Sequence, residues 1–331
     1  MKVLSLFSGI GAFEKALTNM GVKYELVNYC EIDKYASKSY SAIHNVSEDL
    51  NLGDITKVDT SKLPRNIDLL TYGFPCQDIS TSGNMRGFEY DGKRTRSGLF
   101  FEALRMIKDC QPKICICENV KNLTSKKFEK EFSIVLESLE STGYINYWKV
   151  LNSKDYGIPQ NRERVFIISI RKDIDKGYEF PKPFPLKLFL KDILETNVDE
   201  KYYVNNIQTV TNNSVLIREA TKKGYAEAYE GDSINLEQPN SKTRRGRVGK
   251  QVAQTLTTSP QQAVVLPKLR IRKLTSKECW KLQGFDNDDF IKASEHISDS
   301  QLLKQAGNSI TVDVIEELYE ELFKIYWNEV R

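Results

Sequence analysis

The sequence of 331 residues contains only two histidines, His44 and His296. A mechanism that needs a histidine base or several histidine metal ligands is therefore nearly excluded. None of the six cysteines forms a C-x-x-C pair, which argues against a zinc cluster or a disulfide scaffold and favours a reducing cytoplasm. No run of about eighteen or more apolar residues occurs, so we expect no membrane span.

The charge and the N-terminus add little. The formal net charge of +3 is almost neutral and does not indicate a class of partner. Two short basic clusters, Lys93–Arg96 and Lys242–Arg247, could each be a solvated face. The segment Met1–Phe7 is too short and too strand-like for a signal peptide.

The first half of the chain alternates short apolar runs with amphipathic helical patterns. This alternation predicts an α/β fold, with a doubly wound and mostly parallel sheet that binds ligands at the carboxyl ends of its strands. The expected strands are Val3–Phe7, Glu25–Glu31, Ile67–Gly73, Ile114–Glu118, Ile145–Leu151 and Val165–Ile170. The expected helices are Ala12–Met20, Phe100–Cys110 and Lys127–Thr142.

The composition changes near Lys172, after which Pro, Asn, Thr, Gln and Tyr become frequent and helical periodicity is weak. We predict a small inserted domain of short strands and loops over residues 172–271. Residues 1–171 and 272–331 are expected to form the other domain, which would carry any catalytic and cofactor-binding residues at its strand ends. A C-terminal helix, Val312–Trp327, is expected to pack on that first domain.

A glycine turn follows the first strand. In Phe7–Phe13, Gly9 and Gly11 would let the backbone approach a ligand closely. The third glycine of the dinucleotide pattern is absent, because Glu14 stands in its place. A turn of this kind is about as often structural as functional.

Two carboxylates follow at later strand ends. Glu31 could accept both hydroxyls of a ribose, and Asp54 could accept a hydrogen bond from an adenine amino group. Each alone could be a surface carboxylate or a helix cap. Together with the glycine turn they favour a nucleoside-bearing cofactor, and leave a nicotinamide and S-adenosylmethionine both open.

The segment Gly73–Ser80 carries the candidate nucleophile. Cys76 follows the expected strand Ile67–Gly73, and Pro75 stiffens the turn that carries Cys76. A buried structural cysteine is the commoner case, but Gln77 and the polar residues after it argue against that interpretation. The following loop has several glycines that could act as hinges over a substrate.

Further along the chain, Glu118 stands where another strand ends, which places a carboxyl group near Cys76 at one edge of the sheet. Arg162 and Arg164 alternate in an extended segment, so they are expected on one face. Arginine pairs well with planar acceptors and phosphates, although a charged strand edge would show the same pattern.

These motifs resemble those of the cytosine-C5 DNA methyltransferase family. The family's landmarks appear in order over residues 3–170 and 272–326. They are Phe-Ser-Gly-Ile-Gly, Gly-Phe-Pro-Cys-Gln, Glu-Asn-Val, Gln-Asn-Arg-Glu-Arg and Gln-Ala-Gly-Asn-Ser. The variable stretch between Arg164 and Lys273 matches the family's target recognition domain in place and size.

The resemblance implies methyl transfer from S-adenosylmethionine to carbon 5 of a cytosine flipped out of duplex DNA. The implied catalytic residues are Cys76, Glu118, Arg162 and Arg164. The implied cofactor residues are Phe7, Gly9, Gly11, Glu31, Ile32, Asp54, Ile55, Pro75, Asn308 and Ser309. The implied DNA-binding residues are Ser80, Ser82, Arg96, Arg244, Arg245, Arg247 and Thr255. No metal is implied.

The chemistry explains these residue types. A thiolate that adds to carbon 6 turns carbon 5 into an enamine-like nucleophile, and a carboxyl group at ring nitrogen 3 stabilises the charge that develops. The resemblance also implies a monomer in the bacterial cytoplasm beside the nucleoid. It allows for a restriction endonuclease that acts separately.

Three other functions are weighed. A transfer RNA cytosine-5 methyltransferase would use the same catalytic residues, but such relatives usually carry Pro-Pro-Cys and a smaller insert. A catalytically silent DNA-binding relative would not need Cys76 and Glu118. A nicotinamide oxidoreductase fits least, because the third glycine is absent.

Overall fold

The computed structural model describes residues 1–81, 83–204, 211, 213–238, 241 and 243–327. The chain divides into two compact units. The first consists of Met1–Leu151, Glu163–Lys182 and Ile315–Arg331, and the second of Asn152–Arg162 and Pro183–Val314. In the part of the chain that the structure describes, no helix has the length and apolar character needed to cross a membrane.

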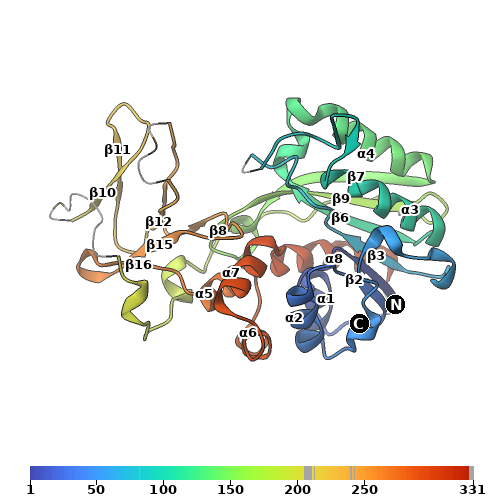
Figure 1. Cartoon of the computed structure of the whole chain (residues 1–331), viewed down its shortest axis with the longest axis horizontal. Helices are drawn as coiled ribbons and strands as arrows, with labels where there is room; N and C mark the ends of the chain where they lie inside the picture. Colours follow the sequence, from blue (N-terminus) through green and yellow to red (C-terminus); the bar gives the residue numbers. More distant parts are fainter. Residues whose placement is uncertain (82, 205–210, 212, 239–240, 242, 328–331) are drawn as a thin grey trace. The chain divides into compact units, whose positions relative to one another are not determined.

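The first unit is built on a six-stranded sheet in the order β2-β1-β3-β6-β9-β7 (Figure 1). The strands are β1 (Lys2–Leu6), β2 (Glu25–Cys30), β3 (Leu69–Tyr72), β6 (Ile114–Val120), β7 (Tyr144–Asn152) and β9 (Glu163–Arg171). The pairs β1–β2, β1–β3 and β3–β6 are parallel, and β9 runs antiparallel to β6. The predicted α/β fold with a mostly parallel sheet is therefore confirmed.

Helices cover both faces of this sheet, which explains why its strands are apolar along their length. They are α1 (Ala12–Asn19), α2 (Lys34–His44), α3 (Phe100–Cys110), α4 (Glu129–Ser141) and α8 (Val312–Tyr326). Alternate strand residues such as Leu70 and Tyr72 share one core cluster with α3 and α4. Figure 1 shows α1 and α8 on the opposite face. Helix α2 was not predicted.

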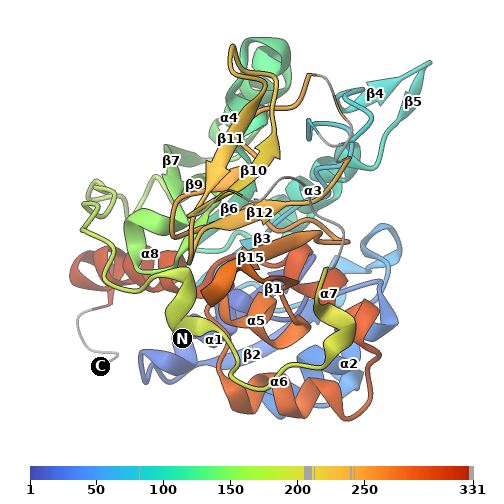
Figure 2. The same cartoon turned by 90° about the vertical axis from the view of Figure 1, so that its left-hand side faces the viewer.

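The described residues of the second unit form short strands and three α-helices (Figure 2). The strands are β8 (Gln160–Asn161), β10 (Val215–Arg218), β11 (Tyr225–Ala228), β12 (Ser233–Asn235), β13 (Val248–Gly249), β14 (Ala253–Gln254), β15 (Gln262–Val265) and β16 (Ile271–Lys273). The helices are α5 (Ser276–Lys281), α6 (Asn287–Ser294) and α7 (Asp299–Asn308). Strands β10 and β11 form a hairpin, and β13-β12-β15-β16 form a sheet.

The boundaries of the second unit differ from the predicted insert of 172–271. The unit begins at Pro183, includes Asn152–Arg162 and continues to Val314. Side chains explain the extension: Arg272 of β16 forms a buried pair with Glu278 of α5, and the side chain of Gln160 donates to the carbonyl of Leu282. These contacts join the helices after residue 275 to the short strands.

Candidate active site

The loop after β1 has an unusual backbone. Phe7, Gly9 and Gly11 all have positive φ angles, of 52°, 56° and 80°. For Phe7 this conformation is strained, and such strain persists where surrounding contacts hold it, often at functional sites. The amide of Gly9 donates to Glu31 Oε2 at 2.9 Å, which ties this loop to the end of β2.

Glu31 is held in place by backbone groups. Its Oε1 accepts from the amide of Asp33 at 2.7 Å. Burial raises the pKa of the Glu31 carboxyl group. The neighbouring Ile32 leaves 71% of its surface exposed, which is unusual for a large apolar side chain. A partly buried carboxylate beside an exposed apolar surface suits a ligand with a sugar and a flat ring.

Asn51, which the sequence did not identify, joins Glu31 to the segment that follows. Its side chain accepts from the Glu31 amide at 3.0 Å and donates to the Glu31 carbonyl at 2.9 Å. The same Oδ1 accepts from the amide of Gly53 at 2.9 Å. The position of Asn51 just before Leu-Gly-Asp was the available signal, because Asn commonly organises turns.

Asp54 and Ile55 lie directly after this junction. Asp54 caps a short turn, where its Oδ1 accepts from the amide and the hydroxyl of Thr56. These bonds lower the pKa of Asp54, with the Thr56 hydroxyl as the largest cause. Ile55 is buried in the core beside α3. Cofactor contacts from both residues stay predictions.

The turn that carries Cys76 is fixed at both ends. The Cys76 carbonyl accepts from the amides of Ile79 and Ser80, at 2.9 and 2.7 Å. Before the turn, Asn119 Nδ2 donates to the Phe74 carbonyl at 3.0 Å. The parallel pairing of Tyr72 with Cys117 means that β3 and β6 deliver their following residues to the same end of the sheet.

Cys76 differs from the other five cysteines. All six are reduced, but Cys76 alone is partly exposed and the rest are buried. Burial raises the pKa of each buried thiol, for Cys30 to about 12. A raised pKa suppresses the reactive thiolate, so these five are poor nucleophiles. The exposure of Cys76 therefore supports its predicted role.

Asp78 closes the base of the loop after Cys76. Its amide donates to Ser97 Oγ at 3.1 Å, and its carboxylate accepts from the Ser97 amide at 3.4 Å. Its carbonyl accepts from Gly87. Both Asp78 and Ser97 are buried. This pairing could not be predicted, because the two residues are separated by the whole loop.

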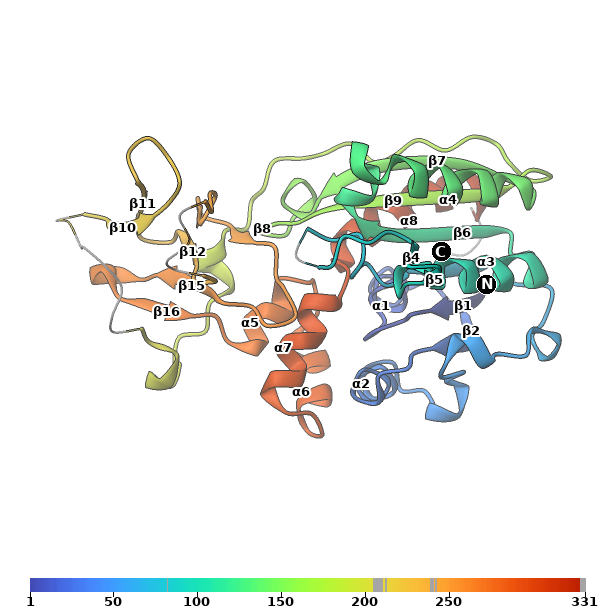
Figure 3. The same ribbon diagram turned by 45° about the horizontal axis from the view of Figure 1, so that its top comes forward.

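The loop itself forms a small exposed hairpin, β4 (Glu89–Tyr90) and β5 (Lys93–Arg94), seen beside α3 in Figure 3. Arg96 is exposed at its end. Ser80 lies at its start and accepts from Gly83 through its carbonyl. Ser82, the third predicted DNA contact here, lies outside the described residues.

Glu118 and Arg164 form an ion pair on neighbouring strands. Arg164 Nε lies 2.9 Å from Glu118 Oε1, and neither side chain is fully buried. The antiparallel pairing of β6 with β9, which puts Val120 opposite Arg164, brings the two side chains together. The carboxylate is therefore fixed at the same end of the sheet at which β3 leads to Cys76.

Arg162 has a different environment from Arg164. It lies between β8 and β9, is 2% exposed and belongs to the second unit. Its guanidinium donates to the carbonyls of Leu256, Gly307 and Ser309. Within its unit, Arg162 therefore joins the segment at Leu256 to the end of helix α7. Arg162 and Arg164 were expected on one face, but they bind different partners.

Asn308 and Ser309, the predicted contacts to the methionine part of a cofactor, end helix α7. Asn308 is exposed and Ser309 is buried. Both belong to the second unit, and their contacts to a cofactor stay predictions. Thr255 lies in the same unit, where its hydroxyl donates to the Asn161 carbonyl at 2.7 Å.

The three predicted DNA-binding arginines of the second unit divide into two kinds. Arg247 is 2% exposed, and its guanidinium donates to the carbonyls of Glu237 and Gln238. Arg247 therefore supports the backbone around Glu237, and its contact to DNA stays a prediction. Arg245 is exposed, and Arg244 is partly exposed in an ion pair with Glu237 at 2.8 Å.

Comparison with known proteins decides the family. A model of the family described as "C-5 cytosine-specific DNA methylase" matches residues 1–324. The chain belongs to this family. It is 36% identical to the orphan methyltransferase M.SPRI of Bacillus phage SPR, over 99% of both chains. It is 35% identical to the type II methyltransferase M2.ScrFI of Lactococcus lactis subsp. cremoris, over 98% of this chain and 99% of that one.

A solved structure shows the same fold. It is a putative DNA modification methyltransferase encoded within a prophage, from E. coli, with a TM-score of 0.67 and 20% identity. The match covers 98% of this chain and 99% of that one. The family match does not favour the transfer RNA enzyme, the silent relative or the oxidoreductase considered from the sequence.

S-adenosylmethionine is the cofactor of this C-5 cytosine methylase family, and the residues present fit it. A Cβ on Gly9 would meet no atom within 4 Å, so the loop after β1 is open on that side. Glu31 offers a carboxylate beside this opening, and Ile32 offers an apolar surface. These three residues match a ligand that combines a ribose with an adenine ring.

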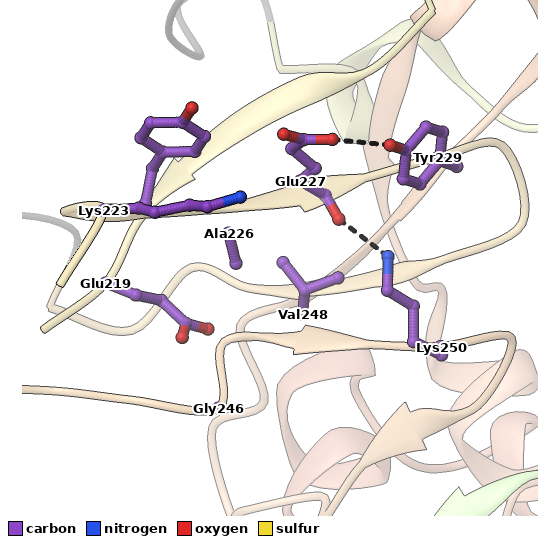
Figure 4. A pocket seen from close by; sticks show the side chains of 9 residues that line it. Glu219, Lys223, Ala226, Glu227, Tyr229, Gly246, Val248 and Lys250 are labelled. Atoms are coloured by element: carbon purple, nitrogen blue, oxygen red, sulfur yellow. Dashed lines mark hydrogen bonds between the residues drawn. The ribbon is translucent and has the colours of Figure 1, made fainter. Parts of the chain in front are cut away.

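The hairpin β10–β11 of the methylase carries a pocket with both charges and aromatic rings (Figure 4). Tyr229 donates to the Glu227 carboxylate at 2.5 Å, and Lys250 lies over the Tyr229 ring at 4.7 Å. Lys250 also binds the Glu227 carbonyl and Asp232, each at 2.7 Å. The pocket is thus a fixed polar surface within the second unit.

Proposed function

We propose that this methylase transfers a methyl group to carbon 5 of a cytosine in a short sequence of duplex DNA, with Cys76 as the covalent nucleophile. The observation that carries the proposal is the arrangement at one end of the sheet. There, β3 leads into the fixed turn of Cys76, and β6 ends at the ion pair of Glu118 with Arg164.

In this mechanism the Cys76 thiolate adds to carbon 6 and breaks the conjugation of the ring. Glu118 protonates ring nitrogen 3, or donates a hydrogen bond to it, which stabilises the negative charge. Arg164 keeps Glu118 in place and contacts the carbonyl oxygen of the base. Bound S-adenosylmethionine would supply an electrophilic methyl group to carbon 5 and would be left as S-adenosylhomocysteine. A base then removes the carbon 5 proton, and Cys76 leaves.

We also propose that residues 172–271 recognise the DNA sequence. Its candidate DNA contacts are Arg244, Arg245 and Thr255. The arginines could bind either base edges or phosphates. In the first unit, Ser80 and Arg96 of the glycine-hinged loop are candidate contacts. The monomeric state, the place beside the nucleoid and a separately acting restriction endonuclease stay predictions.

Bisulfite sequencing tests the reaction and the nucleophile together. Wild type, Cys76→Ser and the control Cys110→Ala are expressed in a bacterial host that lacks cytosine methylation. We expect protected cytosines at one short motif with wild type and with the control, whose cysteine is buried in α3. Cys76→Ser should protect none. Full conversion with soluble wild type would overturn the proposal, and transfer RNA would then be assayed.

A further inference from the structure

The glycine loop after β1 is held from a second side by a histidine. His44 is the last residue of α2, and its Nε2 lies 3.1 Å from the carbonyl oxygen of Ile10. A carbonyl can only accept, so Nε2 carries the proton of this hydrogen bond. Ile10 is buried, and its carbonyl is therefore paired by this side chain within the fold.

The imidazole also fills the space behind Gly11. A Cβ added to Gly11 would lie 2.1 Å from His44 Nε2 and 2.8 Å from the ring of Tyr40. With a φ of 80°, Gly11 takes a conformation that glycine adopts without cost. The loop thus packs its backbone directly against the imidazole, with no side chain between them.

An aromatic stack supports His44. Its ring centroid lies 4.6 Å from that of Tyr40, which in turn stacks on Tyr29 at 4.1 Å. Tyr29 belongs to β2, which leads directly to Glu31. Because Glu31 binds the amide of Gly9, the loop is fixed on one side by Glu31 and on the other by His44.

We propose that His44 is a positioning residue for the cofactor, which acts through the carbonyl of Ile10 and the backbone of Gly11. This inference rests on the proposed cofactor site at the Phe7–Gly11 loop. A loop with strained backbone angles must be ordered before a ligand binds it, and any ordering that the fold does not supply weakens affinity. His44 supplies part of that order without contact to the reacting atoms.

Three substitutions separate the hydrogen bond from the packing. His44→Phe keeps a ring and loses the donor, His44→Gln keeps a donor and loses the ring, and His44→Ala loses both. The control is His296→Ala, which changes the exposed second histidine of the chain. The dissociation constant of S-adenosylhomocysteine is measured by calorimetry on the full chain, beside thermal unfolding and the single-turnover rate at saturating S-adenosylmethionine.

We expect His44→Phe to weaken binding of S-adenosylhomocysteine by roughly three- to tenfold, the effect of one net hydrogen bond. His44→Gln should recover part of this loss, and His44→Ala should bind most weakly. The saturated single-turnover rate of His44→Phe should equal that of wild type. His296→Ala should match wild type in every measurement.

Two results would overturn the inference. One is wild-type affinity in His44→Phe, and the other is equal loss in His44→Gln and His44→Ala, which would deny any role to the donor. If His44→Ala unfolds, the Phe and Gln variants still decide the question. Failure of wild type itself to bind S-adenosylhomocysteine would instead remove the proposed cofactor site, so the two failures are distinguishable.

Discussion

Arg164 Nε lies 2.9 Å from Glu118 Oε1, and the two side chains keep 15% and 12% of their surfaces accessible. The pair is therefore ordered by the fold and still open to a substrate. A carboxyl group that binds one ring nitrogen must be placed before the base arrives, because a misplacement of about 1 Å can cost roughly 100-fold in rate.

Arg164→Lys should lower kcat by about 10- to 100-fold, since an ammonium cannot reproduce the planar contact of a guanidinium. Binding of S-adenosylhomocysteine should not change, because Arg164 acts on the base and on Glu118. Single-turnover methylation of a DNA duplex measures the rate. The control is Glu163→Gln. Glu163 lies on the same strand as Arg164, and the substitution removes its exposed ion pair with Lys121. Equal rates in wild type and Arg164→Lys would contradict the assignment.

Asn119 positions the turn of Cys76 through its bond to the Phe74 carbonyl. Asn119→Ala removes this buried donor, and we expect kcat to fall about tenfold because the nucleophile is then less well oriented. The rate at which a 5-fluorocytosine duplex traps the enzyme covalently measures thiolate addition and methyl transfer together, because fluorine at carbon 5 blocks the final elimination, and it should fall by the same factor.

Asn146→Ala is the matched control for this change. Asn146 of β7 makes a similar bond to the carbonyl of Leu136, at 3.0 Å, and has no part in the Cys76 turn. We expect Asn146→Ala to lose as much unfolding free energy as Asn119→Ala and to keep full activity. If both variants lose activity equally, the effect of Asn119 is one of stability alone.

The sheet could be predicted because its inner strands are short apolar runs buried on both faces, and because a parallel sheet gathers its chemistry at one end. This is why Cys76 and Glu118 could both be proposed from the sequence. Helix α2 was missed because Lys34–His44 is mostly polar and contains three serines, a residue type that competes with the helix backbone for hydrogen bonds. Its cap is clear in the structure, where Asp33 accepts from two amides.

Other features could not be predicted because they depend on pairs far apart in sequence. Nothing in a basic cluster indicates that Arg247 turns inward while Arg245 stays exposed, since burial is decided by the carbonyls of another segment. The hydrogen bond between Asp78 and Ser97 could not be predicted for the same reason. The predicted end of the insert likewise missed the pairing of Arg272 with Glu278.

Arg272 and Glu278 should contribute strongly to the stability of the second unit as a pair. Both are almost fully buried, and two contacts of 2.6 and 2.8 Å join them. Removing one partner leaves a buried charge, so Glu278→Gln should cost about 3–5 kcal/mol of unfolding free energy. Replacing both with apolar residues should cost less. Urea unfolding measures each variant.

The exposed pair of Arg270 with Glu200 is the control for this experiment. Its charges stay in water, so Arg270→Met should change the unfolding free energy by less than about 1 kcal/mol. A cost for Glu278→Gln as small as that of the control would show that the buried pair is not needed for the fold.

Glu14 should make the stability of the protein depend on pH near neutrality. It is fully buried in α1, and the Ser5 hydroxyl offsets only part of the cost of burying its carboxyl group. Burial raises its pKa to about 7, well above the ordinary value of 4.5. Burial, and then the charge of Glu14, also raise the pKa of Tyr24 to about 12, so a polar cluster surrounds the carboxyl group.

The sign follows from the raised pKa. The folded state binds the proton more tightly than the unfolded chain, so stability is full below pH 4.5 and falls as the pH rises to about 7. A shift of this size corresponds to a loss of about 3 kcal/mol, complete above that pH. Glu14→Gln removes the titration. The unfolding free energy of the variant minus that of wild type should therefore increase as the pH rises from about 4.5 to about 7, and should be constant above pH 7.

Urea unfolding of wild type and Glu14→Gln at several pH values between 5 and 8.5 tests this prediction. Glu179→Gln, which changes an exposed carboxylate, should leave the pH dependence of wild type unchanged. The decisive quantity is the difference between variants as a function of pH, because a buried amide has its own constant cost. A difference that stays constant from pH 5 to pH 8.5 would mean that Glu14 does not titrate in this range.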